Sequence, residues 1–155
     1  MIRRAGCRFE NLLPEMPIHI FKPEPQGSQM VALVPCEGFS ARGIALTLNR
    51  SGEEPGLMFF PVITPPQGIG MMYTPGFLRW DAGAKTLIAT EGSDMCPDLL
   101  RQYTYRYRDN TGLRSGAIVN WVLMKVEVAH SSCGSNNKWM TYWEAPIFPD
   151  LPRPN

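Results

Sequence analysis

A pair of strand-like runs near the C-terminus constrains the fold of this chain more than any other stretch. In the first run, residues 118–130, valine or methionine recurs at every second position from 122 to 128, and a period of two is the mark of a pleated strand. The two predicted faces hold Val122, Met124, Val126 and Val128 on one side, and Trp121, Leu123, Lys125 and Glu127 on the other. The second run, residues 138–144, follows a turn rich in serine and asparagine. We therefore expect a wide antiparallel hairpin in the core.

The rest of the chain is typical of further short strands separated by turns. Its 15 prolines and 14 glycines are consistent with many turns, and no long helix is predicted. The predicted strands are residues 17–21, 29–36, 44–48, 57–63, 77–80, 86–90 and 103–108, with a loop at 64–72 and a single helical turn at 98–102. Strands that recur every roughly 8–12 residues are typical of all-β proteins. We predict an all-β fold, an antiparallel sandwich or open barrel of about eight to nine short strands with little helix.

Chain length bounds the domain organisation. A chain of 155 residues is typical of one domain and is long enough to bury a sizeable core. We expect a single β domain over residues 1–155, with an irregular segment at residues 1–16 and a proline-rich tail at 146–155. The run at 29–36 is almost continuously apolar, which predicts a strand that is buried on both faces.

The charge balance argues against nucleic-acid and membrane-surface partners. The formal net charge is +1, and no block of like charges occurs. Tyrosines alternate with threonine and arginine in residues 103–108, and we interpret this run as a strand with its tyrosines inward rather than as a base-stacking surface. No apolar run approaches the ~18 residues of a transmembrane helix. The basic start at Arg3 and Arg4 is not followed by an apolar stretch, so we expect a secretion leader to be absent from this sequence.

Four cysteines are spread along the chain, at Cys7, Cys36, Cys96 and Cys133. Their even number, wide spacing and turn context favour disulfides formed in an oxidising compartment. No C-x-x-C pair indicates a zinc or redox motif. Three pairings are possible, and we favour Cys96–Cys133 together with Cys7–Cys36. The alternative is four reduced thiols in a cytosolic protein.

Catalytic, metal and cofactor chemistry find little support in the sequence. Its two histidines, His19 and His130, lie far apart, whereas a metal site needs three or four ligands. His130 precedes two serines and a cysteine, but neighbours on an extended chain point apart, and a catalytic triad gathers distant segments. We therefore predict no metal and no cofactor, and we assign no catalytic residue.

The tryptophans are the best candidates for a partner surface. Exposed aromatic side chains on a sheet bind sugars or peptides. Both faces of the strand around Trp121 are apolar, which favours burial of most of these rings in the core. We name four candidate partner-surface residues, Trp121, Trp139, Tyr142 and Trp143.

Three groups of segments follow one another in a distinctive order. They are a predicted strand that ends at Pro35 and Cys36, a strand–turn–strand at residues 77–87 that precedes Cys96, and residues 122–128 with Cys133 and residues 139–145. Together these segments resemble the C-terminal portion of a family of uncharacterised secreted bacterial proteins, domain-of-unknown-function family 1176. The resemblance covers roughly residues 18–146. It implies a periplasmic location, disulfides among these cysteines, and no assigned activity.

These observations predict a non-catalytic β domain, periplasmic or secreted, that binds a protein or glycan partner. Two alternatives stay open. One is an inhibitor of an envelope-directed hydrolase such as a lysozyme, and the other is a small hydrolase that uses His130 or His19. The sequence does not fix an oligomeric state.

Overall fold

The computed structural model describes residues 18–36, 42–48, 55–64, 68–91, 99–108, 120–130 and 137–146. Within these ranges it contains eleven strands, all paired antiparallel, and no helix. The all-β prediction is therefore confirmed. The predicted N-terminal segment at 1–16 and almost all of the tail at 146–155 lie outside the described residues.

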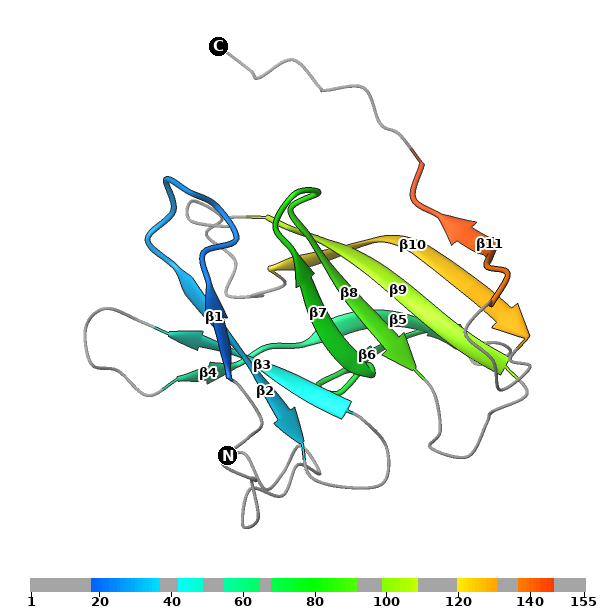
Figure 1. Cartoon of the computed structure of the whole chain (residues 1–155), viewed down its shortest axis with the longest axis horizontal. Coiled ribbons are helices and arrows are strands. Elements are labelled where there is room, and N and C mark those ends of the chain that lie inside the picture. The colour runs from blue at the N-terminus through cyan, green and yellow to red at the C-terminus, as the bar shows by residue number, and fades with distance from the viewer. Residues whose placement is uncertain are drawn as a thin grey trace.

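The strands form three open sheets (Figure 1). The first sheet has the order β1 (His19–Phe21), β2 (Met30–Cys36), β3 (Arg42–Leu48) and β4 (Gly56–Leu57). The five-stranded sheet has the order β11 (Met140–Glu144), β10 (Trp121–His130), β9 (Leu99–Tyr107), β8 (Thr86–Glu91) and β7 (Phe77–Asp81). A two-stranded sheet pairs β5 (Phe60–Thr64) with β6 (Gly68–Met72). Edge strand β7 lies next to the first sheet, on the side of β3 and β2.

One core joins all three sheets. Its fully buried side chains include Val31 from β2, Ala45 from β3, Phe60 from β5, and Tyr105 and Trp121 from the five-stranded sheet. The tyrosines of β9 face inward and Arg106 faces solvent, as the period-two pattern predicts. This packing of one sheet face against another is the sandwich arrangement.

Strand β2 is buried on both faces, as its continuous apolar run predicts. Val31 and Leu33 belong to the shared core, whereas Ala32 and Val34 belong to a second cluster with Ile44 and Leu46 on the opposite face. Alternating residues of one strand thus serve two separate apolar clusters.

Strand β10 departs from the strict alternation that the sequence predicts. Trp121, Leu123 and Val126 are all buried, while Val122 is exposed. The reason is a shift in the pairing with β9 between Leu123 and Lys125, where β10 carries one extra residue. An inserted residue moves every later side chain to the other face of the sheet. The prediction that Val122 and Val126 share a face is therefore wrong.

Three other local predictions are corrected. The predicted strand at 57–63 is two strands in different sheets, because β4 pairs with β3 and β5 pairs with β6. The predicted loop at 64–72 contains β6, whose glycines and methionines pair with β5 in spite of their weak strand propensity. The predicted helical turn at 98–102 is wrong over its described residues, since β9 begins at Leu99 and is paired on both sides.

Candidate functional site

A cavity of about 430 Å³ lies where edge strand β7 meets β1, β2 and β3. We call it the corner cavity. Its apolar part is formed by Leu33, Val34 and Pro35 of β2, Gly43 of β3, and Leu78 of β7. Because β7 is the last strand of its sheet, side chains from both of its faces border the cavity. The volume is within the roughly 300–1,000 Å³ typical of ligand sites.

Two glycines bring the sheets together beside this cavity. The Gly43 amide donates a hydrogen bond of 2.9 Å to the Gly76 carbonyl oxygen, which ties β3 to the residue before β7. Gly76 has a φ of 142°, and a Cβ atom there would lie 2.3 Å from the Thr90 carbonyl oxygen. A Cβ on Gly43 would lie 3.6 Å from the Leu78 side chain. The close approach at the corner therefore requires glycine at position 76.

Aromatic rings form one wall of the corner cavity. Trp80 borders it and stacks on Phe21, with ring centroids 4.3 Å apart and planes 17° apart. His19 also borders the cavity and stacks on Phe21, with ring centroids 5.6 Å apart. Phe77 completes the wall and stays 50% exposed. His19 and Phe21 are two residues apart on β1, so the period of two places both rings on this side.

Two arginines, each on a strand of a different sheet, border the same cavity. Arg42 begins β3 and Arg79 lies on β7, and both are exposed. In the part of the chain that the structure describes, neither guanidinium has an ion-pair or side-chain hydrogen-bond partner. The described wall includes no serine, threonine, cysteine or carboxylate side chain. The described lining therefore combines an apolar surface with positively charged hydrogen-bond donors.

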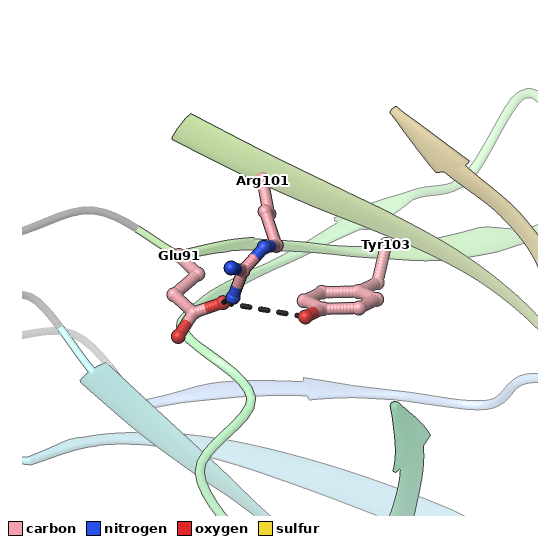
Figure 2. A network of polar contacts seen from close by, with 3 residues as sticks. All are labelled: Glu91, Arg101 and Tyr103. Atoms are coloured by element: carbon pink, nitrogen blue, oxygen red, sulfur yellow. Dashed lines mark hydrogen bonds and ion pairs between the residues drawn. The ribbon is translucent and has the colours of Figure 1, made fainter. Parts of the chain in front are cut away.

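A second polar group of residues lies at one end of the five-stranded sheet (Figure 2). Arg101 and Glu91 pair across β9 and β8 with an N–O distance of 3.2 Å, and the Tyr103 hydroxyl donates to the same carboxylate at 3.2 Å. Burial of Tyr103, with the facing Glu91 carboxylate, raises the pKa of this phenol to about 12. Burial likewise raises the pKa of Tyr105 well above its usual value, and its hydroxyl donates to the Pro61 carbonyl oxygen at 3.0 Å. Each of these four side chains, Glu91, Arg101, Tyr103 and Tyr105, thus has a polar partner within the protein.

The structure separates the four predicted partner-surface residues. Trp121 is fully buried, and its indole N–H lies 3.2 Å from the Met58 sulfur, so it belongs to the core. Tyr142 is 51% exposed on β11. Trp139 and Trp143 are half-buried, and Trp143 packs against the shared core. Tyr142, with the half-buried Trp139 and Trp143, stays a candidate partner surface.

The two histidines are placed differently. His19 borders the corner cavity, whereas His130 is exposed at the end of β10. Residues 131–136, which follow His130, lie outside the described residues. Among the described side chains, no group of three His, Cys, Asp or Glu gathers in a way that would hold a metal ion.

Cys36 is the one cysteine that lies within the described residues. It is buried and disulfide-bonded, and no free cysteine occurs in this part of the chain. Cys7, Cys96 and Cys133 lie outside the described residues, so the favoured pairings stay predictions.

Sequence reasoning missed Arg42, Phe77 and Arg79 as site residues. Phe77 and Arg79 alternate with Leu78 and Trp80, which predicts two faces for β7 but not what lies against it. Glycine often marks a close approach of backbone, and Gly43 and Gly76 do lie at this corner, but two glycines do not indicate which segments meet there.

Comparison with known proteins adds no relative. No protein-family model matches the chain, and neither a curated protein nor a solved structure matches it. The resemblance to domain-of-unknown-function family 1176 stays a prediction. None of the described residues belongs to a helix long and apolar enough to cross a membrane.

Proposed function

We propose that this chain is a non-catalytic binding module, periplasmic or secreted, and that it binds a protein or glycan partner through the corner cavity. The observation that carries the proposal is the aromatic and apolar cavity, with two guanidinium groups at its border that have no partner among the described residues. A concave apolar site with a few convergent polar groups is the usual form of a ligand-binding site.

The test compares two surfaces with matched variants. Phe77 at the corner cavity and Tyr142 on β11 are exposed to nearly the same degree, 50% and 51%. A panel of oligosaccharides and short peptides is titrated against the whole chain, with tryptophan emission as the readout because Trp80 borders the cavity. We expect Phe77→Ser to weaken binding about tenfold, corresponding to one lost apolar contact, and Tyr142→Ser to leave it unchanged.

The opposite result for the two variants would show that the partner binds elsewhere than at the corner cavity. Loss of binding in Tyr142→Ser with full binding in Phe77→Ser would place the partner on β11, with Trp139 and Trp143 as its neighbours. Turnover of any panel member by the wild-type chain, abolished in His19→Ala or His130→Ala, would favour the hydrolase alternative instead.

The proposed location rests on the cysteines. Cys36 is disulfide-bonded, and stable disulfides are typical of oxidising compartments. We propose a disulfide framework that involves all four cysteines, in line with the resemblance to a secreted family. A thiol count on the denatured protein is expected to show no free thiol before reduction and four after it. Four free thiols before reduction would contradict both the framework and the location.

A further inference from the structure

We propose that the corner cavity receives an apolar side chain of a partner protein together with a carboxylate that lies next to that side chain. The inference rests on the proposed function, because it names the chemistry that the same cavity recognises. It is drawn from the two parts of the cavity, which differ in what they offer to a ligand.

The aliphatic part of the cavity favours a peptide over a sugar. Leu33, Val34 and Leu78 border the cavity together with the aromatic residues Trp80 and Phe77, so most of its described lining is apolar. An apolar side chain that enters this space removes apolar surface from water on both partners. Sugar hydroxyls against the same aliphatic carbons would lose hydrogen bonds to water without replacement.

The cationic border favours a carboxylate on that ligand. Arg42 and Arg79 approach the cavity from β3 and β7, and each guanidinium carries five N–H donors and no acceptor. Their planar fork matches the two oxygens of a carboxylate. The acid closest in sequence, Asp81, is engaged elsewhere, since its Oδ1 accepts a hydrogen bond of 2.9 Å from the Ala84 amide in the β7–β8 turn. The charge on the described wall of the cavity is therefore positive, and a ligand carboxylate would complement it.

Isothermal titration calorimetry on the whole chain tests this with three small probes. N-acetylphenylalanine and N-acetylphenylalaninamide share one side chain and differ by one carboxylate, and glucuronate carries a carboxylate on a sugar. We expect the acid to bind about tenfold more tightly than the amide, since charge-assisted hydrogen bonds are the stronger ones. We also expect glucuronate to bind more weakly than the acid.

Matched arginine variants test whether Arg42 and Arg79 cause the tighter binding of the acid than of the amide. Arg42→Gln and Arg79→Gln are each expected to reduce the preference for the acid to about threefold, because each removes one of the two charges at the cavity, and the double variant should remove the preference. Arg106→Gln is the control: Arg106 is also exposed and lies on β9 away from the cavity lining, so its replacement is expected to keep the tenfold preference. Raised salt provides a measurement that needs no variant, since it is expected to weaken binding of the acid and to leave the amide unchanged.

The outcomes separate this inference from the proposed function. Equal binding of acid and amide would overturn the carboxylate preference and leave the cavity as a binding site. Tighter binding of glucuronate than of N-acetylphenylalanine would overturn the protein partner in favour of an acidic glycan. Absence of binding for all three probes at millimolar concentration would overturn both proposals.

Discussion

The inner face of the five-stranded sheet and the corner cavity are both rich in aromatic side chains, and they differ in how their polar groups are partnered. On the inner face, the indole N–H of Trp121 meets the Met58 sulfur, and the hydroxyls of Tyr103 and Tyr105 donate to Glu91 and Pro61. At the corner cavity, Arg42 and Arg79 have no partner among the described residues.

The difference indicates which aromatic residues stabilise the fold and which remain available to a ligand. Buried polar groups need partners, and where the protein supplies them the rings form a closed core. Exposed donors beside an apolar hollow keep their capacity to bind something else. The predictions below change one region at a time, and each asks whether the division holds.

Loss of Trp121 is expected to have the largest effect on stability. The ring is fully buried and contacts the rings of Phe60, Trp80 and Tyr107. Trp121→Ala should lower the free energy of unfolding by about 3–5 kcal/mol, as for other large core truncations. Urea denaturation followed by circular dichroism measures it, with Tyr142→Ala as the exposed control at about 0.5 kcal/mol or less. A cost for Trp121→Ala below that of the control would show that the inner face is not the stabilising region.

A methyl group at Gly76 is expected to have the next largest effect. Its Cβ would clash with backbone atoms of Thr90 and Glu91, which cannot move as a flexible side chain would. Gly76→Ala should cost about 2–3 kcal/mol, because the clash adds to the strain of a positive φ. Gly70→Ala is the matched control, since the nearest atom to its Cβ would be Val62 Cγ2 at 3.9 Å. A similar midpoint of unfolding for the two variants would contradict the tight corner.

Alkaline pH is expected to destabilise the protein through the core tyrosines. The pKa of Tyr103 is raised from 10.0 to about 12, and that of Tyr105 is raised as well. The folded state therefore keeps protons that the unfolded state loses above pH 10, so this contribution to stability is complete below pH 10 and decreases as the pH rises toward about 12. Urea midpoints measured across this interval should fall, and they should fall less steeply in Tyr103→Phe. A flat profile in the wild-type protein would contradict the assignment.

The hydroxyl of Tyr103 is expected to contribute modestly at neutral pH. Tyr103→Phe keeps the ring and removes the hydrogen bond to Glu91, which should cost about 1 kcal/mol. Tyr142→Phe, on the exposed ring of β11, should cost nothing measurable. Equal stability of the two variants would show that the polar group at the end of the sheet is not needed for the fold.

Changes at the border of the corner cavity are expected to have the smallest effect on stability. Phe77→Ala, Arg42→Gln and Arg79→Gln should each stay within about 0.5 kcal/mol of the wild-type protein, because all three side chains are exposed and the arginines have no partner among the described residues. Thermal unfolding measures it. A loss as large as that of Trp121→Ala would make these residues part of the core rather than of a binding site.

Much of the fold could be predicted because it follows from local pattern. The apolar run at 29–36 predicted strand β2 and the burial of both its faces. The turn at Asp81 predicted the β7–β8 hairpin. In that turn Lys85 adopts a φ of 53°, and the Asp81 side chain accepts the Ala84 amide. These features depend on neighbours in sequence.

What could not be predicted depends on pairing between distant segments. The extra residue in β10 shows only against β9, and β6 is extended because β5 lies beside it. The corner cavity is assembled from β1, β2, β3 and β7, and nothing in the sequence indicates that β7 is an edge strand next to β3. The candidate site therefore could not be predicted from hydrophobic periodicity and amino-acid composition.

The most direct test of the central claim is a nuclear magnetic resonance titration of the whole chain with N-acetylphenylalanine. If the corner cavity is the binding site, the largest changes in amide chemical shift will occur at Gly43, Leu78, Arg79 and Trp80. The amide chemical shifts of residues 140–144 will not change. Shift changes confined to residues 140–144, with Gly43 and Leu78 unaffected, would contradict the account and place binding on β11.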